Sequence, residues 1–141
     1  ELSDSLKSEV TVQLFLKFSG TVNDQLCGFY KSKYKNLQTN EDKIMLTTQF
    51  EGTHALTGSI LFLQNFFVAA VDARRAFPCF DEPALKASFQ LALIFPKNLT
   101  ALSNTSVVAQ NMDYSETQQR VLFDVTPVMS TYLVAYIIGT W

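Results

Sequence analysis

Short alternations of apolar and polar residues with a period of two restrict the fold of this chain more than any other feature. Such a period places the apolar side chains on one face of a strand. Gly, Pro, Asn and Asp residues that favour turns separate the runs. The alternating runs cover residues 10–18, 44–50, 87–95 and 121–125, and residues 131–138 are apolar on both faces, as expected of a central strand. The pattern predicts a single all-β domain, an antiparallel sandwich or barrel.

The composition excludes several functional classes. Apolar residues make up 48% of the 141 residues, with 12 Phe and 5 Tyr, which is unlike a disordered chain. The net charge of −2 provides no basic surface for nucleic acid. His54 is the one histidine, so a catalytic zinc site built on a His pair is excluded, and two cysteines allow at most one disulfide. We therefore expect no nucleic-acid partner, and no metal or other cofactor bound by this chain itself.

The segment 54–71, HALTGSILFLQNFFVAAV, departs from the alternation because 12 of its 18 residues are apolar. Gly58, Gln64 and Asn65 interrupt it, and it is shorter than the roughly 20 apolar residues of a membrane span. A pair of strands and a buried helix are both compatible with a run of this length. The sequence leaves these alternatives open and does not establish a membrane segment.

Gln49 and Glu51 form the first candidate site. They have the same parity along a strand, so both side chains point to the face opposite Phe50. A carboxylate beside an amide is suited to bind a primary ammonium group, because the carboxylate supplies charge and the amide supplies orientation. The alternative interpretation is that the pair is simply the solvated face of a strand.

Residues 72–83, DARRAFPCFDEP, form the second candidate. Two prolines bracket a compact loop in which Arg74 and Arg75 lie within reach of Asp81 and Glu82 for ion pairs. With no histidine nearby, Cys79 has no base to activate it and is expected to behave as a small apolar residue. This loop is therefore interpreted as structural.

Five motifs occur in order along the chain: FYKSKY at 29–34, TQFE at 48–51, DARRAFPCFDEP at 72–83, ALSN at 101–104 and TPVMSTYLVAY at 126–136. Taken together, they resemble the N-terminal β-domain of zinc aminopeptidases of the aminopeptidase N type, most of all the puromycin-sensitive branch. The resemblance covers nearly everything from about residue 10 to residue 139 except 54–71.

The resemblance implies a saddle-shaped β-domain that packs on a catalytic domain of the same parent chain. It also implies that Gln49 lines the first substrate subsite and that Glu51 helps to hold the free α-amino group of a peptide substrate. The family's zinc ligands and catalytic residues correspond to no position of this sequence. On this basis no catalytic or metal residue is assigned here, and zinc is expected only in the parent enzyme.

One departure from the family concerns the segment that follows Glu51. In relatives the strand that carries Gln-Phe-Glu runs almost directly into the Ala-Arg-x-Ala-Phe-Pro-Cys segment, so residues 54–71 are interpreted as an atypical apolar insertion into a single domain spanning 1–141. A real variant, a splice form and a translated intron are all compatible with such an insertion. Because an apolar run leads directly to Trp141 and the first residue is Glu1, the domain is expected to be incomplete at both ends.

The resemblance thus predicts a fragment of an enzyme that removes N-terminal amino acids from peptides. A non-catalytic β-sandwich interaction module is the rival hypothesis. The puromycin-sensitive branch favours a cytoplasmic location, whereas aminopeptidase N is a membrane-anchored ectoenzyme. Glycosylation acceptor patterns at Asn98 and Asn104 have meaning only in the second case.

Overall fold

The computed structural model describes residues 11–37, 39–51 and 71–140, and these residues form an all-β structure. Every pairing between its strands is antiparallel, which confirms the predicted fold class. In chain order, the described elements are β1 (Gly28–Lys35), β2 (Asp42–Gln49), the 3₁₀ turn η1 (Ala73–Arg75), β3 (Ala92–Pro96), β4 (Thr100–Ser103), β5 (Val107–Asp113), β6 (Gln118–Phe123), the 3₁₀ turn η2 (Thr131–Leu133) and β7 (Tyr136–Gly139).

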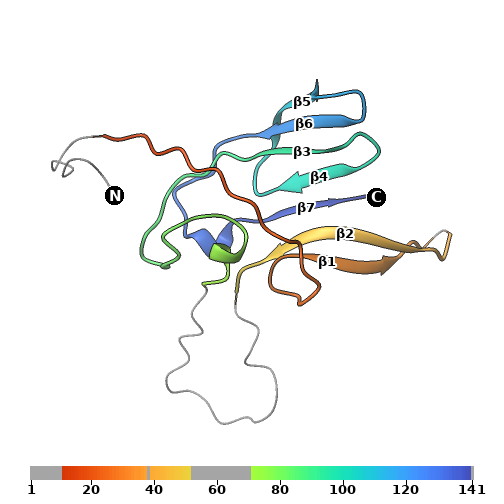
Figure 1. Ribbon diagram of the computed structural model, residues 1–141, viewed down its shortest axis with the longest axis horizontal. Coiled ribbons are helices and arrows are strands. Elements are labelled where there is room, and N and C mark those ends of the chain that lie inside the picture. Colours follow the sequence, from red (N-terminus) through yellow and green to blue (C-terminus); the bar gives the residue numbers. More distant parts are fainter. Residues whose placement is uncertain (1–10, 38, 52–70, 141) are drawn as a thin grey trace, which may run out of the picture.

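The strands form two sheets, one with the order β1-β2-β7-β4 and one with the order β3-β6-β5. β3 and β4 follow each other in the chain but belong to different sheets, so their short connection leads from one sheet to the other (Figure 1). β1 and β2 form a hairpin in which Gly28 lies opposite Gln49. β7 lies between β2 and β4, so the prediction of a central strand within 131–138 is confirmed for residues 136–138. Residues 131–133 form η2 instead, so the predicted strand was too long.

Two clusters of buried apolar side chains hold the structure together. The first lies between the two sheets and contains Phe95, Ala101, Val121, Phe123 and Ile138. Phe95, Val121 and Phe123 come from the predicted alternations in β3 and β6, and their burial confirms which faces of these strands point inward. Phe50, Ala73 and Val134 form the second cluster, which joins the end of β2 to η1 and to the residue after η2.

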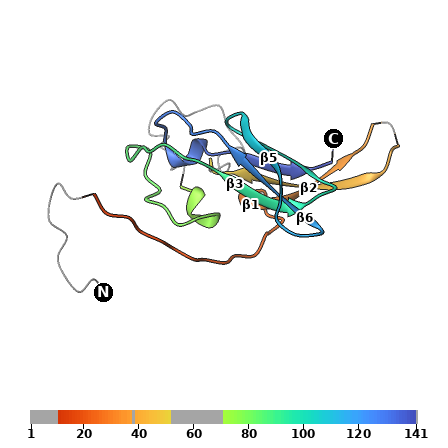
Figure 2. The same cartoon turned by 90° about the horizontal axis from the view of Figure 1, so that it is seen from above.

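The strand predicted at residues 10–18 is absent from 11–18, the part of it that the structure describes. This segment, drawn in red in Figure 2, runs outside the strands, and its apolar side chains are exposed, with Leu14 at 74%. Alternation fixes which side chains share a face, but a strand also needs a neighbour that satisfies its backbone hydrogen bonds. No described strand pairs with residues 11–18.

Two further predictions meet the structure only in part. Val125 was expected on the inner face with Val121 and Phe123, but it lies beyond the end of β6 and is 50% exposed. Ile44 is likewise exposed although it shares the parity of Leu46, because the far end of the β1–β2 hairpin extends past the core. The predictions for the segment 54–71 are not tested here, because all of it except Val71 lies outside the described part of the chain.

Candidate functional site

Gln49 and Glu51 lie where β2 ends. The Gln49 side chain donates a hydrogen bond from Nε2 to the main-chain oxygen of Glu51 at 3.1 Å. Phe50, between them, is only 2% exposed, whereas Glu51 is exposed to solvent. The structure thus brings the two predicted side chains to the same end of the strand, with Phe50 as the buried residue between them.

Residues after the segment 52–70 hold this end of β2 in place. The main-chain N–H of Asp72 donates to the main-chain oxygen of Phe50 at 3.3 Å. Ala73, which is completely buried, belongs to the same cluster as Phe50, and the Phe77 ring meets the Phe50 ring edge-on with centroids 6.0 Å apart. The chain therefore leaves Phe50 and returns to it after 21 intervening residues.

Arg75 packs against Gly28, the first residue of β1. A Cβ atom placed on Gly28 would lie 2.8 Å from Cβ of Arg75, and Gly28 has a φ of +69°, which disfavours other residues. Because Gly28 is the β1 partner of Gln49, η1 is in close contact with the end of the hairpin that carries the predicted substrate pair.

Two ion pairs organise the loop 72–83, and they differ in part from the predicted ones. Arg74 pairs with Asp81 as expected, with Nε and Oδ2 3.3 Å apart. Arg75 instead pairs with Asp72, its Nε lying 2.7 Å from Oδ1. The hydrogen bond to Asp72 and the attraction of its charge raise the pKa of Arg75. Glu82, the remaining predicted partner, is exposed.

Cys79 in this loop is a free thiol that is partly buried against the second cluster, which contains Phe50. Burial raises the pKa of this thiol above its usual value, and the negative charge of Asp81 acts in the same direction. A thiol that holds its proton more tightly is a poorer nucleophile at neutral pH. The electrostatics therefore agree with the interpretation of Cys79 as a small apolar residue.

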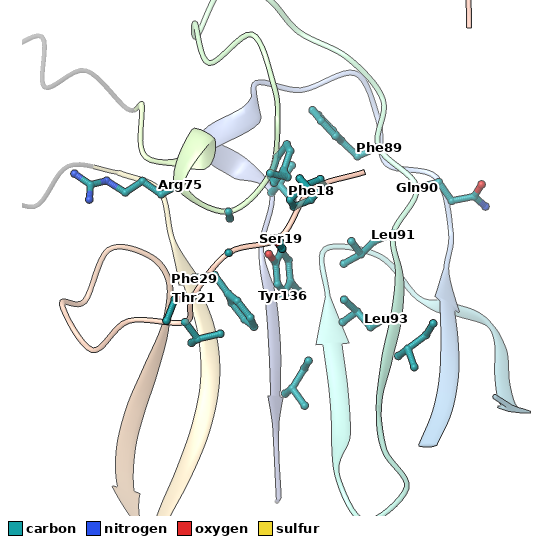
Figure 3. A pocket seen from close by; sticks show the side chains of 17 residues that line it. Phe18, Ser19, Thr21, Phe29, Arg75, Phe89, Gln90, Leu91, Leu93 and Tyr136 are labelled. Carbon is teal, nitrogen blue, oxygen red and sulfur yellow. The ribbon is translucent and has the colours of Figure 1, made fainter. Parts of the chain in front are cut away.

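An open apolar cleft of about 530 Å³ lies where the two sheets meet. Figure 3 shows the rings of Phe29, Phe89 and Tyr136 and the side chains of Leu91 and Leu93 around it, while the polar ends of Arg75 and Gln90 point away. Sequence reasoning missed this cleft, because its walls come from segments far apart in the chain.

Burial in this cleft raises the pKa of Tyr136 to about 12. Between pH 10 and pH 12 the unfolded chain loses the phenol proton and the folded chain keeps it, so the stability due to the neutral phenol is complete below pH 10 and is lost as the pH rises through 12. We expect the free energy of unfolding to fall less steeply above pH 10 in Tyr136→Phe, by about 1 kcal/mol per pH unit. Urea titrations of both proteins at pH 9, 10 and 11 measure the difference, and parallel pH dependences would contradict it.

The described residues do not provide a set of zinc ligands. Within 11–37, 39–51 and 71–140, no three His, Cys, Asp or Glu side chains are grouped so that they would hold a metal ion. In the loop 72–83, Asp72 and Asp81 form ion pairs with arginines of the same loop. These residues do not fit a zinc site of the kind that the family resemblance implies for the parent enzyme.

Comparison with known proteins identifies the family. The sequence model of the peptidase M1 N-terminal domain matches residues 1–57 and 67–133, so its break at 58–66 falls within the segment 54–71. Three curated relatives are the yeast (Saccharomyces cerevisiae) protein named aminopeptidase 2, mitochondrial, aminopeptidase N of Bos taurus and puromycin-sensitive aminopeptidase of Caenorhabditis elegans. This chain is 46% identical to the first over 126 residues, 40% to the second over 140 and 40% to the third over 128.

These alignments cover 89%, 98% and 91% of this chain, respectively. They cover 11% of the first relative and 12% of each of the other two, so the chain spans about an eighth of the length of the relatives that it matches. The resemblance drawn from the motifs is confirmed over most of the chain. The chain belongs to the family of peptidase M1 N-terminal domains.

Proposed function

We propose that this chain is the N-terminal part of a zinc-dependent aminopeptidase that removes N-terminal amino acids from peptides, and that it supplies recognition of the substrate's amino terminus. The family membership and the names of the relatives support the enzyme class. The observation that carries the recognition role is the end of β2, where an exposed Glu51 follows an anchored Phe50 and Gln49 contacts the Glu51 backbone.

The chemistry of the pair fits a free α-amino group. An ammonium group has three donors and a positive charge, and an exposed carboxylate accepts from it in a charge-assisted hydrogen bond. Gln49 contributes orientation, because its amide is already directed along the chain toward Glu51. In the enzyme, zinc would polarise the scissile carbonyl and activate water. The role of this chain is to bind and orient the end of the substrate.

The metal and the residues that hold it are expected in the catalytic domain of the same parent chain. We therefore expect the isolated 141-residue chain to release no amino acid from amino acid 4-nitroanilides, with or without added zinc. Absorbance of released nitroaniline measures this directly, with a full-length aminopeptidase as the positive control. Zinc-dependent turnover by the purified chain, abolished by a chelator, would contradict the proposal.

Substitution of Glu51 in the full-length enzyme tests the recognition role. Glu51→Gln keeps the volume and removes the charge, so kcat/KM for substrates with a free amino terminus should fall about tenfold or more, since a hydrogen bond to a charged group contributes roughly 1.5–3 kcal/mol. Gln49→Ala should lower kcat/KM by a smaller factor, because the amide supplies no charge. The size of this decrease should depend on the first side chain of the substrate. The exposed Glu82→Gln is the matched control and should leave kcat/KM unchanged. An unaffected Glu51→Gln together with an inactive Gln49→Ala would reverse these assignments.

A cytoplasmic location is proposed from the resemblance to the puromycin-sensitive branch, with a membrane-anchored ectoenzyme as the alternative. The helical elements of the described residues are the two short 3₁₀ turns η1 and η2, and neither could span a membrane. The two acceptor asparagines differ in their surroundings. Asn98 is exposed between β3 and β4, whereas Asn104 donates to the Leu133 oxygen at 2.9 Å and accepts from the Ala135 N–H at 2.8 Å.

A further inference from the structure

The buried carboxylate of Asp81 connects two distant segments. Its side chain has no exposed surface. One oxygen, Oδ2, accepts from the main-chain N–H of Arg74 at 3.0 Å and from Arg74 Nε at 3.3 Å. The other, Oδ1, accepts from the hydroxyl of Thr131 at 2.7 Å. Asp81 therefore fixes η1, through the backbone of Arg74, relative to η2, through Thr131.

Three contacts link η1 to the end of β2. Asp72, the residue before η1, donates from its main-chain N–H to the oxygen of Phe50. Ala73 and Phe50 are buried in the same cluster. The Cβ of Arg75 lies against Gly28, the β1 partner of Gln49. A displacement of η1 therefore acts on Phe50 and Gln49 together.

Glu51 is the residue that follows Phe50, and no described strand pairs with it. The position of its carboxylate thus depends on how well Phe50 is held. Recognition of a small charged group by a hydrogen bond requires the acceptor within about half an ångström of its productive position. A displacement of η1 would therefore weaken binding of the substrate's amino terminus without removing any group that contacts the substrate.

We propose that Asp81, held by Thr131, is a positioning residue for Gln49 and Glu51 and acts through η1; this inference rests on the proposed function. Asp81 touches neither side chain of the pair in the described contacts. Its effect is on the binding of the α-amino group, which is present in both the ground state and the transition state. Such a uniform binding contribution changes KM and leaves kcat nearly constant.

The test uses three threonine variants of the full-length enzyme. Thr131→Val keeps the shape of the side chain and removes the donor to Asp81, and Thr131→Ser restores a hydroxyl. Thr126→Val is the matched control, because Thr126 is also a buried threonine with hydrogen bonds at its hydroxyl, to the Phe89 N–H and the Pro127 oxygen. kcat and KM for amino acid 4-nitroanilides and the unfolding temperature are measured for each variant, for Glu51→Gln and for Glu51→Gln combined with Thr131→Val.

The expected result is a KM three- to tenfold higher for Thr131→Val with kcat within twofold, and a KM near the original value for Thr131→Ser. Thr126→Val should lower the unfolding temperature with no change in KM. In the double variant, Thr131→Val should add little to the KM effect of Glu51→Gln, since both act on the same contact. Two results would overturn the positioning role. One is a double variant whose increase in KM equals the product of the two single increases. The other is a Thr131→Val enzyme that, like Thr126→Val, has a lower unfolding temperature and an unchanged KM.

The same data separate this inference from the proposed function. If Glu51→Gln leaves KM and kcat unchanged, the recognition role itself is wrong, and the positioning role fails with it. If Glu51→Gln raises KM and Thr131→Val does not, the recognition role stands and the positioning role alone is refuted.

Discussion

Asp81→Asn should destabilise the isolated chain by about 2–4 kcal/mol, the largest loss that we expect from a single conservative substitution. Asparagine has the same shape but offers a donor where aspartate has an acceptor. With its oxygen toward the Arg74 N–H, the amide turns its NH₂ group toward the Thr131 hydroxyl, which must then accept instead of donate. The bonds from Arg74 then go to a neutral amide oxygen and no longer to a charged carboxylate. A hydrogen bond to a charged group contributes about 1.5–3 kcal/mol and a neutral one about 0.5–1.5 kcal/mol, so each bond to the carboxylate is weakened, and the attraction between the carboxylate and Arg74 is lost in addition. Urea unfolding followed by circular dichroism measures the change.

Glu82→Gln is the control for this prediction, because Glu82 is the next residue and its side chain is exposed. It should change the stability by no more than about 0.5 kcal/mol. Equal stabilities for Asp81→Asn and Glu82→Gln would show that the Asp81 hydrogen bonds contribute nothing to folding.

Deletion of residues 54–71 should give a more soluble chain that still unfolds cooperatively. The deletion joins Thr53 to Asp72, so that only three residues separate Phe50 from Asp72. The hydrogen bond that now joins these two residues then spans i to i+4, which is the spacing of an α-turn. Shortening the connection from 21 to three residues lowers the entropy cost of closing it by about 1–2 kcal/mol. Removal of 12 apolar residues also removes an aggregation-prone segment.

A variant in which 54–71 are replaced by 18 Gly and Ser residues distinguishes the two effects. It should share the gain in soluble yield but not the gain in stability, because its loop keeps the original length. Soluble yield and urea unfolding of the three proteins provide the comparison. Loss of cooperative unfolding in the deletion variant would show that 54–71 belong to the core, which would refute their interpretation as an insertion.

The sequence predicted strands best where one face is buried, at residues 92–95 of the predicted run 87–95 and at residues 121–123 of the predicted run 121–125. In β3 and β6 the alternating residues Phe95, Val121 and Phe123 point into the first cluster, because period two and burial coincide there. β1 was not predicted, because GFYKSKYK carries lysines and tyrosines at positions where a buried face would have apolar residues. Its pairing with β2 along its full length makes it a strand nevertheless.

The candidate site was predictable to the extent that its parts are close in sequence. Gln49 and Glu51 are two residues apart, so strand parity and the family motif were enough to single them out as candidates. The contact between Asp81 and Thr131 joins residues 50 positions apart, and nothing in either local pattern specifies it. From charge alone, the sequence could not predict which arginine pairs with which carboxylate. In the structure, the backbone of η1 directs Arg74 toward Asp81 and Arg75 toward Asp72.

The strand order has a consequence for how the chain folds as it is synthesised. β7 lies in the middle of the four-stranded sheet, yet it follows the six other described strands in the sequence. Until the ribosome has released β7, the β1–β2 hairpin and β4 have no strand between them and the sheet is not continuous. Sheets whose paired strands are far apart in sequence form slowly, and their unpaired edges stay exposed until the last strand joins. The edges of β2 and β4 that pair with β7 therefore stay open to other binding partners until the last strand has been made.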